Sequence, residues 1–193
     1  MKKLMLLYLM LPVFSLAAQD FLPQGTVEAV TQQEVEGYTV LNATSGDLNR
    51  DAYPDWVLIY RKTTEAETSD AIDHPEPRPL LLYVGQPDGT LKLAARNDKV
   101  VLCYDCGGVF GDPFSQVVIK NGFFTVEHYG GSSWRWTRLI TFRYQPKAGK
   151  WYLHKDGGDS YHTGDPDKVE TVVKTTKDFG VVAFEAFDCY AEN

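Results

Sequence analysis

The sequence predicts a single all-β domain of antiparallel hairpins and sheets, with at most one or two short helices. From Tyr38 onward, short runs of β-branched and aromatic residues alternate with turn residues, which is the pattern of antiparallel sheet. The 193 residues, 44% of them hydrophobic, are enough for one core, whereas two domains would each be small. We therefore expect one β-rich domain over residues 18–193, preceded by an export signal.

Residues 1–17 have the three parts of a secretory signal peptide. Two lysines precede an apolar run from Leu4 to Leu11, and Ser15 and Ala17 are small residues at the positions expected before a cleavage site, with cleavage after Ala18 as the alternative. The apolar stretch is shorter than the roughly 20 residues that a membrane-spanning helix needs. The sequence thus predicts a periplasmic or secreted protein with no transmembrane segment after cleavage.

The formal net charge is −7, and removal of the two N-terminal lysines makes it more negative. A protein that binds nucleic acid needs a basic stripe that displaces counterions, and here the lysines and arginines are dispersed among more carboxylates. We therefore expect no nucleic-acid partner. The same acidity suits a divalent cation.

The expected strands are short and separated by turn residues. They are Tyr38–Ala43, Trp56–Arg61, Leu80–Gly85, Leu91–Arg96, Lys99–Cys103, Gln116–Lys120, Phe123–Tyr129, Trp136–Tyr144, Trp151–Lys155 and Val181–Phe187.

Two hairpins are the clearest local predictions. Asn121-Gly122 supplies the two positive-φ residues of a type I′ turn between the strands that flank it. The second hairpin turns through residues 145–149, and alternation along its first strand places Ile140 and Phe142 on one face and Thr141 and Arg143 on the other.

Outside the strands, the sequence predicts two short helices and one long loop. Thr26–Glu36 could form the first helix, and Asp165, followed by Pro166, could cap a second. Residues 62–79 have almost no apolar side chain and three prolines near their end, so we expect an exposed loop, and the low hydrophobicity favours disorder.

One loop, directly before an apolar strand, has the composition of a calcium site. Its oxygen-bearing groups are Asp47, Asn49, Asp51, the Tyr53 carbonyl and Asp55. Calcium takes six to eight oxygen ligands, and alternate residues of a tight loop can point at one centre. Leu58 at the twelfth position excludes an EF-hand, which needs a glutamate there. The alternative is an Asp/Asn-rich turn that only caps the strand.

These residues resemble the calcium loop of the FG-GAP repeat, also called VCBS-like, of integrin-type propellers. The resemblance continues to a hairpin with an Asp88-Gly89 turn, covers Thr44–Ala95 and occurs once. It implies calcium binding, but one repeat cannot close a propeller. Ala52 stands where the family usually has glycine, a substitution that would weaken the site if the backbone there is left-handed.

The chain also resembles a family of uncharacterised exported bacterial proteins. The resemblance is carried by residues 106–114, which read Cys-Gly-Gly-Val-Phe-Gly-Asp-Pro-Phe, and by residues 128–136, which read His-Tyr-Gly-Gly-Ser-Ser-Trp-Arg-Trp. It implies export and a β fold but no activity.

Cys103 and Cys106 are expected to form a disulfide, because an exported protein meets an oxidising compartment. The alternatives are a redox dithiol and half of a zinc site, although no second pair of ligands has zinc spacing. Cys189 is left over, either free or as a competing disulfide partner.

Gly130-Gly131 leads into Trp134-Arg135-Trp136, and this tip could contact a sugar or a partner protein. The alternative is that both tryptophans belong to the core. His128 shares a face with Phe124 and Val126, which predicts a buried histidine rather than a general base.

Three functions are compatible with the sequence. The first is a calcium-stabilised, non-enzymatic module that binds an envelope protein or glycan through loop 62–79 or residues 134–136. The second is an envelope hydrolase in which His128 or His162 works with Asp112 or Asp159. The third is an inhibitor or immunity partner of a toxin. The first is favoured because no nucleophile and base are paired in the sequence.

Overall fold

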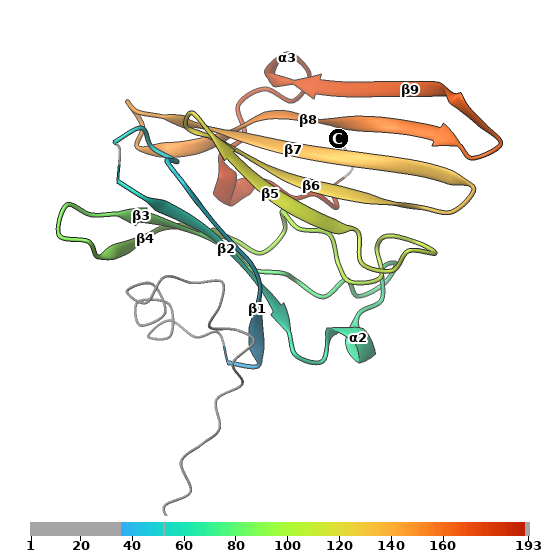
Figure 1. The fold of residues 1–193 in the computed structure, drawn as a ribbon, viewed down its shortest axis with the longest axis horizontal. Helices are drawn as coiled ribbons and strands as arrows, with labels where there is room; N and C mark the ends of the chain where they lie inside the picture. The colour runs from blue at the N-terminus through green and yellow to red at the C-terminus, as the bar shows by residue number, and fades with distance from the viewer. Residues whose placement is uncertain (1–35, 52, 192–193) are drawn as a thin grey trace, which may run out of the picture.

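The computed structural model describes residues 36–51 and 53–191, and over this range the chain folds into two antiparallel sheets (Figure 1). The predicted signal peptide and all but the last residue of the helix expected at Thr26–Glu36 lie outside the described residues. The first four strands form one sheet and the last five form the other, and within each sheet the strands pair in their order along the chain. The all-β, single-domain prediction is confirmed.

The strands are β1 (Tyr38–Gly46), β2 (Asp55–Lys62), β3 (Leu80–Gly85), β4 (Leu91–Asn97), β5 (Phe114–Lys120), β6 (Phe123–Gly131), β7 (Trp134–Gln145), β8 (Lys150–His162) and β9 (Asp165–Thr175). The helical segments described are α2 (Glu65–Thr68), α3 (Thr176–Phe179) and the 3-10 turn η2 (Phe184–Ala186). No helix in residues 36–51 and 53–191 has the length and apolar character needed to cross a membrane.

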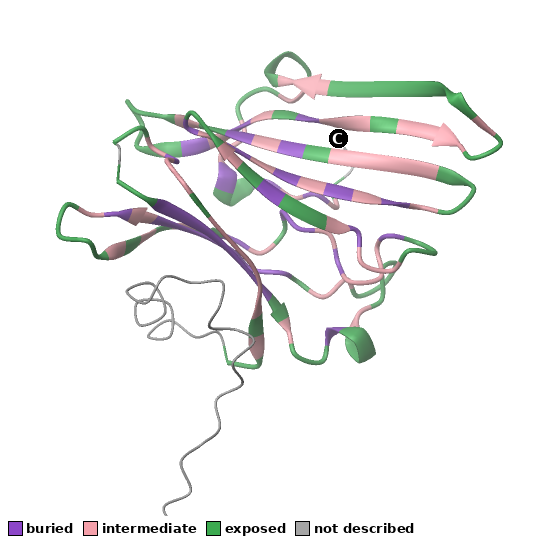
Figure 2. Ribbon diagram, in the orientation of Figure 1, coloured by how far each residue is buried: buried purple, intermediate pink, exposed green. Residues whose placement is uncertain are grey.

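The main core lies between the two sheets. Buried and less buried residues alternate along β6 and the middle of β7, as their period of two predicts (Figure 2). Phe124 and Phe142 stack with their ring centroids 5.0 Å apart, and Phe184 of η2 packs edge-on against both. The C-terminal segment therefore closes the core.

The four-stranded sheet also buries side chains on its other face. A second cluster consists of Trp56, Leu58 and Tyr60 of β2 with Leu81 and Tyr83 of β3. Both faces of β2 are thus apolar, which explains why this strand reads as a continuous hydrophobic run and not as an alternating one.

The two predicted hairpins are confirmed. Asn121 and Gly122 have φ values of 54° and 76°, as a type I′ turn requires, and join β5 to β6. The turn at residues 145–149 joins β7 to β8, and Ile140 and Phe142 are fully buried on the same face.

Three predicted elements were wrong. Residues 99–103 are not a strand: Val100 and Val101 are buried in the core, but the segment has no ladder partner. Val181–Phe187 contains the 3-10 turn and a single bridge to Tyr152 in place of a strand. The helix expected after Asp165 is strand β9, because its valines and threonines favour the pleated conformation and β8 offers an edge to pair with.

Candidate functional site

The predicted calcium loop is attached to the core at both of its ends. Leu48 is fully buried, and its carbonyl accepts a hydrogen bond from Trp151 Nε1 at 3.2 Å. Asp55, also fully buried, accepts from Leu48 N at 2.6 Å and from Gly85 N at 2.9 Å. Burial raises the pKa of Asp55, while these two N–H groups oppose the shift. Asp55 therefore ties the loop to the end of β3.

The exposed part of the loop is a series of short side-chain to backbone bonds. Asp47 accepts from Arg50 N at 2.5 Å, Asn49 from Asp51 N at 3.0 Å and Asp51 from Tyr53 N at 2.9 Å. The Arg50 guanidinium does not approach these carboxylates but donates to the Asn121 carbonyl at 2.9 and 2.7 Å. The loop thus packs against the β5–β6 turn.

The negative charge of this loop has no cationic partner within the described residues, because Asp47, Asp51 and Asp55 take part in no ion pair there. The donor types are the hard oxygens that calcium prefers; Asp47 and Asn49 are half-buried, and Asp51 is exposed. Within residues 36–51 and 53–191, no three acidic, histidine or cysteine side chains are grouped as a metal site. Calcium binding stays a prediction.

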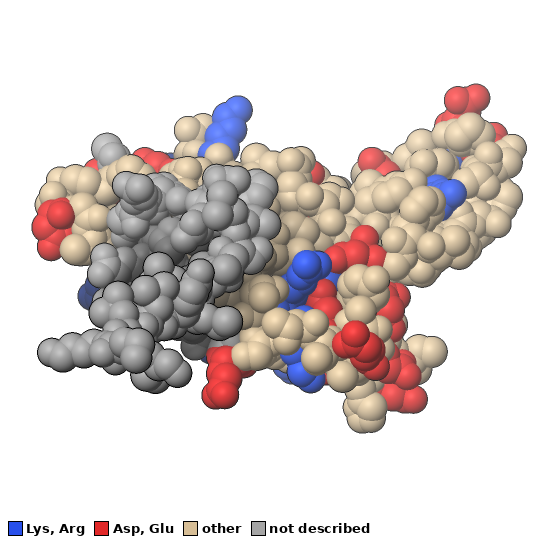
Figure 3. All heavy atoms as spheres, turned by 60° about the horizontal axis from the view of Figure 1, so that its bottom comes forward, with Lys and Arg blue, Asp and Glu red and all other residues tan. Residues whose placement is uncertain are grey.

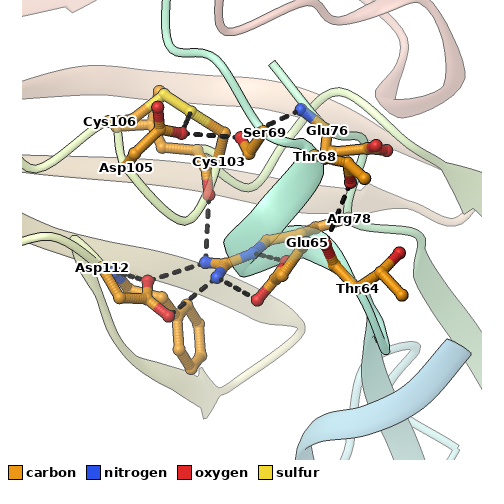
Figure 4. A network of polar contacts seen from close by, with 12 residues as sticks. Thr64, Glu65, Thr68, Ser69, Glu76, Arg78, Cys103, Asp105, Cys106 and Asp112 are labelled. Atoms are coloured by element: carbon orange, nitrogen blue, oxygen red, sulfur yellow. Dashed lines mark hydrogen bonds and ion pairs between the residues drawn. A yellow bond between two sulfur atoms is a disulfide. The ribbon is translucent and has the colours of Figure 1, made fainter. Parts of the chain in front are cut away.

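The cysteine prediction is confirmed in part. Cys103 and Cys106 form a disulfide, and Cys189 is buried and unpaired. Within the small disulfide loop, the Asp105 carboxylate accepts from Ser69 Oγ at 2.6 Å (Figure 4). It also accepts from Ala71 N at 2.8 Å. The disulfide loop therefore holds the middle of loop 62–79.

Arg78 fixes the C-terminal end of loop 62–79, which is folded despite its low hydrophobicity. Its fully buried guanidinium donates to both oxygens of Glu65, at 3.0 and 2.8 Å, and to both oxygens of Asp112, each at 2.7 Å (Figure 4). A fifth bond reaches the Leu102 carbonyl at 3.1 Å. Burial lowers the pKa of Arg78, but the Asp112 and Glu65 carboxylates outweigh burial and raise it above its ordinary value. Most of the loop's other side chains remain exposed.

At the end of the sheet where β6 turns into β7, the glycines bring two loops together. Gly131 N donates to the Gly107 carbonyl at 2.9 Å, and Val109 N donates to the Gly131 carbonyl at 3.2 Å. Gly131 has a φ of 111°, and a Cβ there would lie 1.9 Å from the Trp134 carbonyl oxygen. Only glycine is therefore compatible with the backbone at position 131.

Four side chains lie where these two loops meet, and we name them the aromatic tip: the exposed Val109, Phe110 and Trp134 and the half-buried Arg135. Val109 is 81% exposed, Trp134 56% and Phe110 47%. The Arg135 guanidinium lies 4.0 Å from the Phe110 ring centroid, and Trp134 packs edge-on against His162. The tip contains apolar surface on a chain whose carboxylates outnumber its basic groups. Figure 3 shows acidic side chains at several places on one face of the molecule.

The sequence analysis singled out two of the four residues of the aromatic tip, Trp134 and Arg135. Trp134 is exposed, so the reading that places it in the core is wrong, whereas Trp136 is half-buried and packs over the backbone of Gly130. Val109 and Phe110 were not predicted to belong to this surface. Their only signal is an apolar pair between glycines, in a segment of the chain that lacks a strand pattern.

The groups considered for hydrolysis are each engaged elsewhere. His128 is 1% exposed, as predicted, and its Nε2 accepts from Leu102 N at 3.2 Å. Burial, followed by the Arg138 guanidinium, lowers the pKa of His128 to about 4. The His162 ring accepts from Gly164 N, and Asp159 accepts from Thr171.

No family model matches the chain, and a search of curated proteins finds no relative.

Proposed function

We propose that the chain is an exported binding module that contacts a protein of the bacterial envelope through the aromatic tip. The observation that carries this proposal is the exposure of Val109, Phe110 and Trp134 on a backbone that is fixed by glycine-dependent hydrogen bonds. Side chains presented on an ordered backbone lose little conformational freedom on binding, so more of the contact energy remains as affinity.

A protein partner fits the tip better than a glycan. Tryptophan and arginine dominate the energetics of protein interfaces, and Arg135 is already ordered by its contact with Phe110. The exposed aliphatic side chain of Val109 supplies apolar area next to them, which a protein pocket can bury but a sugar hydroxyl cannot use. Inhibition of a toxin, the third function considered above, would use the same surface.

The test is binding of the purified mature chain to the partner that it captures from envelope extract. Trp134→Ala and Phe110→Ala should each weaken the measured affinity by roughly 30-fold, the effect of losing about 2 kcal/mol at an interface hot spot. Leu139→Ala removes another exposed apolar residue of β7 and is the matched control, expected to leave affinity unchanged. Equal binding by all variants would contradict the proposal.

We also propose that calcium binds the Asp47–Asp55 loop and stabilises this module. Asp47, Asn49 and Asp51 would supply ligand oxygens, while Asp55 holds the loop to the core through its two backbone bonds. The bound cation would neutralise carboxylates that have no cationic partner among the described residues.

Thermal unfolding with EDTA and then with millimolar calcium tests this second proposal. Calcium at 100 times its dissociation constant should add about 2.7 kcal/mol to the free energy of unfolding. Asp51→Ala should abolish the shift, and Asp88→Ala, in an exposed turn of another hairpin, should retain it. Coincident curves with and without calcium would mean that the loop only caps its strand.

A further inference from the structure

A cavity of about 500 Å³ lies at the end of β7 opposite the aromatic tip. Its volume is within the range of small-molecule sites, which is roughly 300–1,000 Å³. Its polar lining consists of Arg143 and Gln145 of β7, Lys147 of the β7–β8 turn, Tyr152 and His154 of β8, and Thr176 of α3.

The charge of this cavity is opposite to that of the chain. Three of its lining residues are basic or can become so, namely Arg143, Lys147 and His154, and none is a carboxylate. The whole chain, in contrast, has 26 acidic and 19 basic side chains. Besides burial, Lys155 and Arg143 lower the pKa of His154, which shows that positive charge converges here. An anion would relieve that repulsion.

The floor of the cavity is ordered by contacts across three strands. Arg143 lies opposite Phe123 of β6 on one side and Tyr152 of β8 on the other. The guanidinium carbon of Arg143 is 5.5 Å from the Phe123 ring centroid, and the His154 ring packs edge-on against the same ring at 5.1 Å. The Arg143 and His154 side chains are therefore positioned before any ligand arrives.

The two walls are also fixed. On one side, Ala148 N and Gly149 N both donate to the Gln145 carbonyl and close the turn that carries Lys147. On the other side, Leu153 N donates to the Val182 carbonyl at 2.8 Å, which holds the segment after α3 against β8. The cavity is part of the folded sheet and not a gap between mobile loops.

We propose that this cavity binds a sugar-sized molecule that carries an oxyanion, either a carboxylate or a phosphate. The Arg143 guanidinium pairs with the oxyanion through its planar fork of donors, with Lys147 as a second cation. The half-buried Tyr152 ring offers a surface for the apolar side of a sugar ring, and Gln145 and Thr176 offer hydrogen bonds to its hydroxyls. This site is independent of the proposed function of the tip.

The test is amide NMR titration of the full mature chain with three probes: glucuronate, glucose 6-phosphate and uncharged glucose. A ligand of this size in a shallow site should bind with a dissociation constant of about 1 mM. At least one anionic probe should shift the amides of residues 143–154, and glucose should not. A response to one anion alone identifies the group that the site accepts. Equal shifts with glucose would overturn the proposal.

Substitutions locate the binding to this cavity. Arg143→Gln and Lys147→Gln should each weaken binding of the anionic probe about tenfold or more, since each removes a charge-assisted contact. Lys147 is an exposed turn residue, so its variant stays informative if Arg143→Gln fails to fold. Lys92→Gln, on the four-stranded sheet, and Trp134→Ala, at the tip, should leave binding unchanged. Undiminished binding by Lys147→Gln and Arg143→Gln would place the anion elsewhere and refute the site.

Discussion

Replacement of Arg78 by methionine removes the buried cation that joins loop 62–79 to the loop before β5. The five hydrogen bonds that Arg78 donates are lost. The Glu65 side chain, which is 4% exposed, then remains as a buried carboxylate without its cationic partner. Asp112 is 28% exposed and can recover water. Breaking a buried ion pair from one side costs about 3–5 kcal/mol, mostly through the charge that is left behind.

Urea unfolding measures this cost directly, with Arg96→Met as the control. Arg96 makes an ion pair with Asp98 in which both side chains are more than a third exposed, so its loss should change stability by less than about 1 kcal/mol. For a chain of this size, the Arg78→Met penalty corresponds to a lowering of the melting temperature by roughly 10 °C.

The double variant Arg78→Met/Glu65→Leu separates desolvation from simple loss of packing. It removes both the guanidinium and the carboxylate that cannot reach water, so it should recover more than about 1 kcal/mol of the single variant's loss. If Arg78→Met costs no more than Arg96→Met, or if the double variant is as unstable as the single variant, the reasoning about the buried charge is refuted.

Three further predictions concern His128 and the cysteines. The pKa of His128 is lowered to about 4 in the folded chain, so as the pH falls the unfolded chain binds a proton on this histidine before the folded chain does. The stabilisation is therefore complete above about pH 6.5, and the free energy of unfolding should fall by about 3 kcal/mol as the pH drops to 4. Urea titrations of His128→Gln should show a smaller fall, and an equal fall would contradict this. The Cys103→Ser/Cys106→Ser variant should lose about 2 kcal/mol in its free energy of unfolding, and proteases should cleave loop 62–79 faster. An unchanged rate of proteolysis would show that the disulfide loop does not anchor loop 62–79. Burial raises the pKa of Cys189 to about 12, so iodoacetamide should label it only after unfolding, and rapid labelling of the native chain would disprove its burial.

The sequence predicts the strands well where local pattern and tertiary packing agree. Along β6, buried Phe124 and Val126 alternate with less buried residues, and Asn121-Gly122 fixes the turn that precedes them. The sequence-based prediction fails where apolar residues pack in the core without pairing with another strand. Val100 and Val101 read as a strand, yet they fill the core from a segment whose carbonyl at Lys99 bonds to Cys189 N near the other end of the chain.

The candidate site was less predictable because it depends on distant pairs. Loop 62–79 looks disordered by composition, but Arg78 is ordered by Glu65, 13 residues away, and by Asp112, 34 residues away. No local pattern encodes that pairing. The aromatic tip has the same origin, because Phe110 joins Trp134 and Arg135 only after Gly107 pairs with Gly131.

After Asp165 the sequence predicted a helix, whereas the structure has strand β9, and this difference also has a physical cause. Asp165 and Pro166 form a good helix start by sequence, yet the following valines and threonines favour a strand. The long edge of β8 then supplies hydrogen-bond partners from Lys155 to His162. Tertiary pairing outweighs a capping signal that is worth only about 1 kcal/mol.

The most direct test of the binding proposal is photo-crosslinking in living cells that express the chain, with p-benzoylphenylalanine placed at Trp134 and, as the control, at Leu139. Both positions lie on β7 and are exposed, but only Trp134 belongs to the aromatic tip. We expect a discrete crosslinked protein from Trp134, in a yield that Phe110→Ala lowers, and none from Leu139. The same product from both positions, or no product from Trp134, would contradict a binding role for the tip.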